Sequence, residues 1–147
     1  KSSRSPAPPR LSDETGRDSR AAFLKAARFF TTTNWEGDDM AKDWLVTLSA
    51  AREALFDADR PFVKMLSSGT TKVELYAPAD YDAQTPHDQD EIYVIVSGTG
   101  MFNKAGERKP FGPHDVIFVE AGVEHRFEGF SDDFQTWVIF FGPKSGD

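Results

Sequence analysis

The fold of this chain is decided by the stretch Thr85-Pro86-His87-Asp88-Gln89-Asp90-Glu91-Ile92-Tyr93-Val94-Ile95-Val96-Ser97-Gly98-Thr99-Gly100. It opens with a polar segment that carries a histidine among acidic and amide side chains. It then becomes a run rich in β-branched residues and ends in glycine-containing turn residues. Because β-branched and aromatic residues fit the pleated surface of a sheet, the run predicts a strand over 91–96 that ends in a turn over 97–100.

A second stretch of similar character follows downstream: Phe111-Gly112-Pro113-His114-Asp115-Val116-Ile117-Phe118-Val119-Glu120-Ala121-Gly122-Val123-Glu124-His125-Arg126-Phe127. Its pattern predicts an apolar strand over 115–119, a bend over 121–123 and another short strand over 125–127. Taken together, the two stretches predict a metal held inside a small β-barrel.

The flanking sequence supports this interpretation of the fold. Further strands are predicted over 62–66, 72–77, 101–103 and 134–141, and a short helix over 49–55. Turn signals separate the strands, and a hairpin turn is expected over 104–107. This makes about eight short strands after Arg60, spaced by roughly ten residues, which is typical of an all-β sandwich or barrel such as a jelly roll.

The N-terminal part has a different character. Residues 1–20 are polar, basic and proline-rich, and they are expected to form a solvated tail. A short helix is predicted over 20–30, and its phenylalanines are expected to pack on the barrel or on a second subunit. We therefore expect an extension over 1–43 and a single β-barrel domain over 44–147.

Composition excludes several functions. The net charge of −7 argues against nucleic acid, because phosphate binding needs a basic surface. No apolar run approaches the length of about 18 residues that a membrane span requires. The chain contains no cysteine, so it has neither a disulfide framework nor a thiolate metal site, which favours a cytoplasmic location.

The chain has only three histidines, at positions 87, 114 and 125. Two histidines and one carboxylate form a facial triad that leaves coordination positions open and suits several divalent metals. Glu91 follows His87 by four residues, an even offset that places both side chains on one face of a regular strand. His125 lies at a glycine-containing bend that leads into a strand.

If these strands are neighbours in the barrel, His87, Glu91 and His125 can meet inside it. A cation there would offset the cost of burying the glutamate charge. We expect one divalent ion, with iron, manganese, nickel or zinc as candidates. The amides of Gln84 and Gln89 could replace a missing ligand or be ordinary loop side chains, and His114 is expected in a turn rather than at the metal.

The same residues resemble the two motifs of the cupin superfamily. The first motif has three or four residues between a histidine and a glutamate and six more before a glycine, as between His87, Glu91 and Gly98. The second has two residues between a glycine and a histidine, as between Gly122 and His125. The resemblance covers about residues 60–143 and implies a double-stranded β-helix, or jelly-roll barrel.

The sequence departs from these motifs at defined positions. Thr85 stands where the first histidine of the family occurs, so a three-histidine site is not available in this register. Glu120 replaces the proline and Gly129 the final asparagine of the second motif. The resemblance implies a wide range of activities, since cupins include dioxygenases, isomerases, lyases, sugar-binding regulators and storage proteins.

Other residues are candidates for the surroundings of the metal. Tyr93 is expected to donate a proton or a hydrogen bond above the metal, as a catalytic residue. Tyr76, Gln89 and Phe127 are expected to line a substrate pocket. For the aromatic residues, packing in the barrel core is the alternative.

The leading functional prediction is a small-molecule enzyme, dioxygenase-like or an isomerase or lyase, that uses one divalent metal and a small oxygen-bearing substrate. One alternative is a non-catalytic barrel that binds a sugar-like or acidic metabolite. Another is a structural dimer module with a vestigial site. The 13 phenylalanines favour a homodimer, because exposed aromatic side chains are rarely left uncovered.

Overall fold

Eight strands and one helix make up residues 44–144, the part of the chain that the structure describes. The structure is a computed structural model, and all described residues belong to one compact unit. In chain order the elements are α2 (Leu48–Phe56), β1 (Phe62–Ser68), β2 (Thr71–Tyr76), β3 (Asp90–Ser97), β4 (Gly100–Lys104), β5 (Glu107–Phe111), β6 (Val116–Val119), β7 (His125–Glu128) and β8 (Gln135–Phe141).

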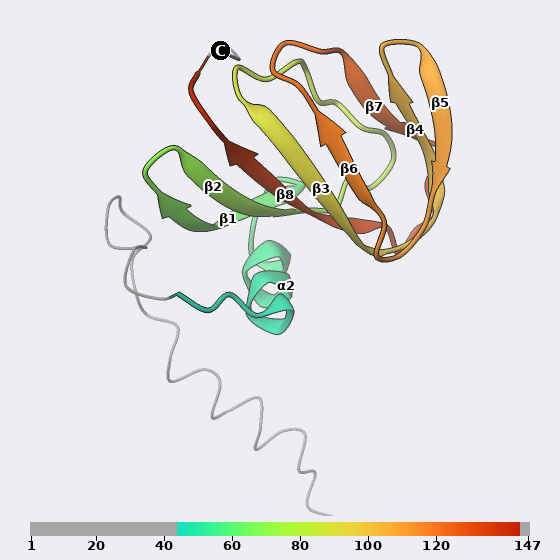
Figure 1. Ribbon diagram of the computed structural model, residues 1–147. Helices are drawn as coiled ribbons and strands as arrows, with labels where there is room; N and C mark the ends of the chain where they lie inside the picture. The colour runs from blue at the N-terminus through green and yellow to red at the C-terminus, as the bar shows by residue number, and fades with distance from the viewer. Residues whose placement is uncertain (1–43, 145–147) are drawn as a thin grey trace, which may run out of the picture. The chain divides into compact units, whose positions relative to one another are not determined.

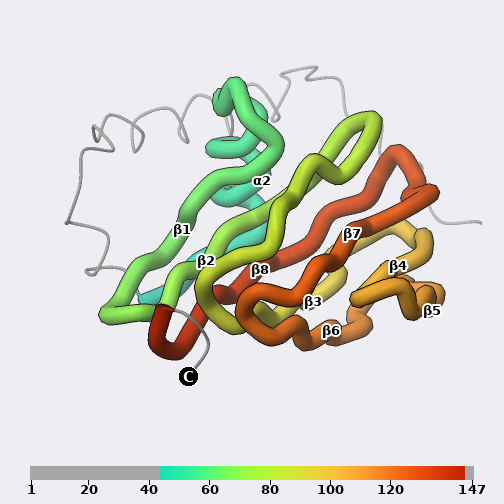
Figure 2. Tube along the Cα trace, turned by 90° about the horizontal axis from the view of Figure 1, so that it is seen from above, coloured from blue at the N-terminus to red at the C-terminus, as the bar shows by residue number. Residues whose placement is uncertain are grey.

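The strands form two antiparallel sheets. One has the order β1-β2-β8-β3-β6 and the other the order β5-β4-β7. In both views β4, β5 and β7 lie on the opposite side of the molecule from β1 and β2 (Figures 1 and 2). This is the predicted all-β jelly-roll architecture, which the structure confirms.

Strand β3 shows how the sequence pattern positions the core. Its burial alternates along the strand, so that Glu91, Tyr93 and Ile95 are buried while the residues between them are partly exposed. The buried side chains face the second sheet and join a largely aromatic core: Tyr76, Tyr93, Ile95, Phe102, Phe111, Val119, Phe127, Phe134 and Val138. Glu91 is the one polar side chain in this buried row.

The predicted elements agree with the structure to within a few residues at their ends. The helix predicted over 49–55 is α2, where the Thr47 side chain caps the first turn by accepting a hydrogen bond from the Ala50 N–H at 3.2 Å. The helix predicted over 20–30 and the rest of the extension over 1–43 lie outside the described residues. Within 44–144, the structure has no helix long and apolar enough to cross a membrane.

Strand β5 is absent from the predicted strands. Its segment is charged and contains Pro110, which lacks the N–H that a central strand would need. Because β5 is the edge of its sheet, one side of its backbone needs no strand partner, and the proline is tolerated there.

Large apolar side chains remain exposed on the opposite sheet. Val116 and Phe118 of the edge strand β6 are 65% and 44% exposed. Side chains of this kind are what a partner subunit would cover. The expected homodimer stays a prediction.

Gly98, in the turn from β3 to β4, is expected to contribute strongly to stability. Its φ is +85°, and an added Cβ would lie 2.6 Å from the Phe134 Cα, which is backbone and cannot rotate away. We expect Gly98→Ala to lower the free energy of unfolding by about 3 kcal/mol, because backbone strain and the overpacking of Phe134 add together. Urea denaturation followed by circular dichroism measures this loss.

Gly106 provides the matched control. Its φ is +91°, but nothing lies within 4 Å of the position of a Cβ. Gly106→Ala should therefore cost only the backbone strain, about 1 kcal/mol. Equal losses at the two glycines would contradict the role given to the close approach at Phe134.

Candidate metal centre

Three side chains from different parts of the fold meet inside the barrel. His87 comes from the loop before β3, Glu91 from β3 of the larger sheet, and His125 from the first position of β7 in the smaller sheet. One possible ligand atom from each lies within 4.8 Å of the others. Glu91 and His125 are only 1% and 3% exposed, and His87 is partly buried. This group could hold a metal ion.

Local structure explains why these residues converge. Glu91 points inward because β3 alternates, and it pairs with Phe140 on one side and Val119 on the other. The glycine-containing bend before His125 is tied to the first motif by a hydrogen bond from the Gly122 N–H to the His87 carbonyl, at 2.8 Å. The two motif segments are therefore joined through their backbones as well as through their side chains.

The hydrogen bonds of His125 determine which nitrogen faces the site. Its Nδ1 lies 2.8 Å from the Val123 carbonyl oxygen. A carbonyl can only accept, so Nδ1 must carry the proton. In the neutral ring, Nε2 then presents a lone pair to the barrel interior, which is the arrangement found in metal-binding histidines.

The Tyr93 hydroxyl lies at the centre of the site. It is 2.5 Å from Glu91 Oε2, 2.9 Å from His125 Nε2 and 2.9 Å from Gln84 Oε1. The Gln84 amide is oriented by its own N–H₂ group, which donates to Asp82 Oδ2 at 3.0 Å. One hydroxyl proton therefore faces three acceptors, and a site with more lone pairs than protons is suited to a cation.

The electrostatics of the site keep Tyr93 protonated. Burial, together with the neighbouring Glu91 carboxylate, raises the pKa of Tyr93 well above its ordinary value. On the other side of the glutamate, His87 Nδ1 lies against Glu91 Oε1, and the His87 ring packs edge-on against Phe140 with centroids 5.1 Å apart. Two imidazoles and one carboxylate form a donor set that fits iron, manganese, nickel or zinc.

Asp82 holds Gln84 of this site in place by hydrogen bonds, and no sequence pattern predicted this role. It is 2% exposed and accepts hydrogen bonds from the Tyr76 hydroxyl at 2.7 Å, the Gln84 N–H at 3.0 Å, the Gln84 side chain and the Phe127 N–H at 2.8 Å. Burial and the adjacent Asp82 carboxylate also raise the pKa of Tyr76. Asp82 thereby fixes Gln84, which in turn contacts Tyr93.

The other predicted site residues make contacts within the protein. Tyr76 bonds to Asp82, and Phe127 packs in the aromatic core. The Gln89 amide donates to the carbonyls of Thr70 and Gly142, at 2.9 and 2.8 Å, and so ties two loops together. Their assignment to a substrate pocket stays a prediction. His114 is exposed, has a φ of +71° and is not part of the three-residue group.

Comparisons with known proteins agree with the fold and the motifs. The family model described as "Cupin domain" matches residues 72–140. A Streptomyces coelicolor protein, itself described as uncharacterized, is 35% identical over 89 residues, which cover 59% of this chain and 85% of that protein. The chain therefore belongs to the cupin family.

Solved structures show the same architecture at low identity. A cupin superfamily protein from Desulfitobacterium hafniense has a TM-score of 0.50 and 17% identity, over 71% of this chain and 96% of the other. A protein from Neisseria meningitidis has a TM-score of 0.54 and 17% identity, over 67% of this chain and 99% of the other. At this level of identity, the likeness concerns the fold alone.

Proposed function

We propose that this cupin is a metal-dependent enzyme that acts on a small oxygen-bearing organic molecule. His87, Glu91 and His125 would hold one divalent metal ion, which would supply Lewis acidity when bound. The observation that carries the proposal is the convergence of one possible ligand atom each from His87, Glu91 and His125, all within 4.8 Å of one another, with two of the three residues buried.

Tyr93 has the position of a hydrogen-bond or proton donor. Its hydroxyl contacts two of the three proposed ligands directly. It can therefore donate a hydrogen bond or a proton to an oxygen of a molecule bound beside it. Gln84, held by Asp82, fixes the orientation of this hydroxyl.

Two reaction classes suit this arrangement. A triad of three protein ligands leaves room for both O₂ and a substrate, which favours oxygenation. A proton donor beside the ligands also suits isomerase or lyase chemistry. The alternative is a barrel that binds an acidic or sugar-like metabolite without converting it.

The proposal is tested by supplying metal-reconstituted protein with 2-oxo acids, 2-hydroxy acids and vicinal diols, either under ¹⁸O₂ or in D₂O. We expect metal-dependent conversion, detected by mass spectrometry, that is absent in His125→Ala. Tyr93→Phe should slow it by about 10²- to 10⁴-fold. Incorporation of ¹⁸O would indicate oxygenation, and incorporation of deuterium would indicate an isomerase or lyase.

Tyr81→Phe is the matched control, because Tyr81 is 74% exposed, and it should leave conversion unchanged. Metal-dependent binding of these compounds without any conversion would refute the enzyme and favour the binding barrel. Conversion that does not depend on His125 would place the chemistry elsewhere.

A further inference from the structure

Beyond the metal centre, the inner face of the larger sheet carries three further charged residues, Lys64, Lys72 and Glu74. The register places them there. Lys72 pairs with Phe140, and Phe140 pairs with Glu91. Directly paired residues of antiparallel strands have their side chains on the same face, so Lys72 shares the inner face with Glu91.

Glu74 is placed in the same way. It pairs with Val138, which pairs with Tyr93, and on its other side it pairs with Lys64. Two strand spacings, about 10 Å, separate Lys72 and Glu74 on β2 from Glu91 on β3, and Lys64 on β1 lies one spacing further away. A lysine side chain is flexible and long enough to cover much of that distance.

Among the described residues, the charged groups of Lys72 and Glu74 make no direct hydrogen bond or ion pair, although Lys72 is the strongest charge that acts on Glu74. Both residues are partly buried. Within residues 44–144, no hydrogen bond and no ion pair shorter than 4.0 Å reaches the Lys72 ammonium or the Glu74 carboxylate. A half-buried charge without a partner is costly, and such groups commonly await a ligand.

The electrostatics connect this face to the metal centre. Burial raises the pKa of Glu74, while the positive charges of Lys72 and Lys64 act in the opposite direction and Glu91 adds to the rise. Glu74 therefore lies within electrostatic range of the Glu91 carboxylate. The two lysines balance the two glutamates of this face, Glu74 and Glu91, so that the face is formally neutral in a chain whose net charge is −7.

We propose that Lys64, Lys72 and Glu74 form an organic-acid subsite. Lys72 binds the carboxylate of a small hydroxy acid whose other end reaches the metal centre, and Glu74 accepts a hydrogen bond from the hydroxyl of that acid. The inference rests on the proposed function, which it deepens by naming the substrate class. Lys64 lies on the edge strand β1, where it is exposed, and it adds a positive charge next to Glu74.

Two matched chelators test the subsite. Succinic monohydroxamate and butanohydroxamate have the same metal-binding group and similar length, but only the first ends in a carboxylate. Titrated into cobalt-loaded protein and followed by visible absorption, the first should bind about tenfold more tightly. Lys72→Met should reduce this preference to about twofold or less, whereas Lys72→Arg should keep most of it.

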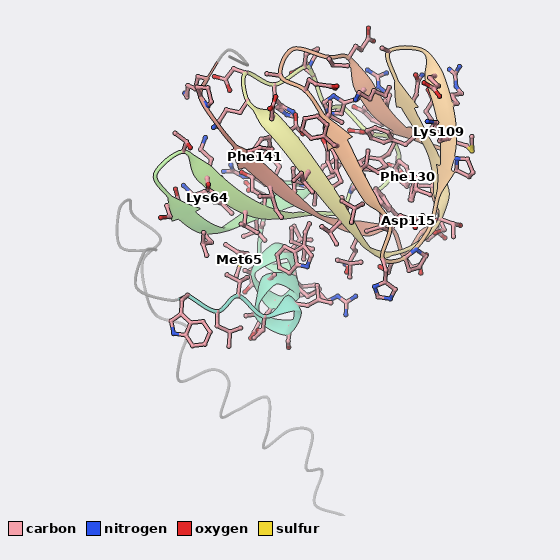
Figure 3. The ribbon with its side chains drawn as sticks, viewed as in Figure 1. Lys64, Met65, Lys109, Asp115, Phe130 and Phe141 are labelled. Atoms are coloured by element: carbon pink, nitrogen blue, oxygen red, sulfur yellow. The ribbon has the colours of Figure 1, made fainter. Side chains whose placement is uncertain are left out.

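Two further variants define the effect. Lys109→Met removes a lysine from β5, where it pairs with Glu107 at 3.1 Å. Figure 3 shows Lys109 on the opposite side of the molecule from Lys64, so this variant should keep the full preference. Glu74→Gln removes a negative charge beside the bound carboxylate and should increase the preference two- to threefold.

The outcomes separate the two proposals. Equal binding of both chelators by wild type, or an unchanged preference in Lys72→Met, would overturn the subsite and leave the metal centre intact. If wild type keeps no cobalt, or if neither chelator perturbs the cobalt spectrum, the proposed function fails and the subsite fails with it.

Discussion

Replacing His125 with alanine is expected to abolish metal binding. The change removes a buried imidazole whose Nε2 lone pair faces the site, and it leaves only two of the three proposed ligands. Substituting a residue that only hydrogen-bonds to a metal ligand lowers metal affinity by about 10- to 100-fold. Loss of a ligand itself should therefore lower it by more than about 100-fold. Plasma mass spectrometry of protein purified without chelator or affinity nickel measures the metal content per chain.

His114→Asn is the control. It also removes a histidine, but an exposed one outside the three-residue group, and asparagine tolerates the positive φ at this position. Its metal content should equal that of wild type, which we expect to be near one ion per chain. Full metal content in His125→Ala, or none in wild type on addition of iron, manganese, nickel or zinc, would refute the centre.

Replacing Asp82 with alanine is expected to cause the largest loss of stability. Four hydrogen bonds end on this buried carboxylate, two of them from backbone N–H groups. Each buried donor left without an acceptor costs about 1–3 kcal/mol, and partial hydration of the resulting space reduces the sum. We expect a loss of about 4 kcal/mol, a large share of the 5–15 kcal/mol that is typical of a domain. Urea denaturation in the presence of a chelator measures it.

Asp80→Ala is the matched control, because Asp80 belongs to the same loop but is exposed. Its effect should stay within about 0.5 kcal/mol. A similar small effect at Asp82 would mean that its hydrogen bonds do not hold the loop on the barrel. Since Asp82 orients Gln84 next to Tyr93, we also expect the Asp82→Ala site to bind metal less tightly than wild type.

Much of the fold follows from local patterns in the sequence. The β-branched and aromatic run over 91–96 and the glycine that follows it predicted β3 and its turn, because such residues fit the pleated surface of a sheet. Strand β5 could not be predicted in this way. It is an edge strand of charged residues around Pro110, and it exists because β4 offers it a partner across a tight turn.

The metal-ligating candidates were predictable for a related reason. The even offset between His87 and Glu91 and the glycine bend before His125 predicted that the three could meet, although His87 lies in the loop before β3 and not in the strand itself. Asp82 was not predictable, since nothing in the loop over 79–84 distinguishes it from its exposed neighbours. Its burial depends on Tyr76 and on the Phe127 N–H, a partner 45 residues away in the chain. The Gln89 side chain likewise donates hydrogen bonds to two distant backbone carbonyls, and no local pattern predicts these bonds.

The division of the three candidate ligands between two sheets has a thermodynamic consequence. An ion held by Glu91 of one sheet and His125 of the other would act as a removable cross-link, present in the folded chain and lost on unfolding. Such coupling adds about 2.7 kcal/mol of stability at a free metal concentration of 100 times Kd. The melting temperature then reports how much of the protein has metal bound. It would rank candidate metals by affinity before any substrate is known.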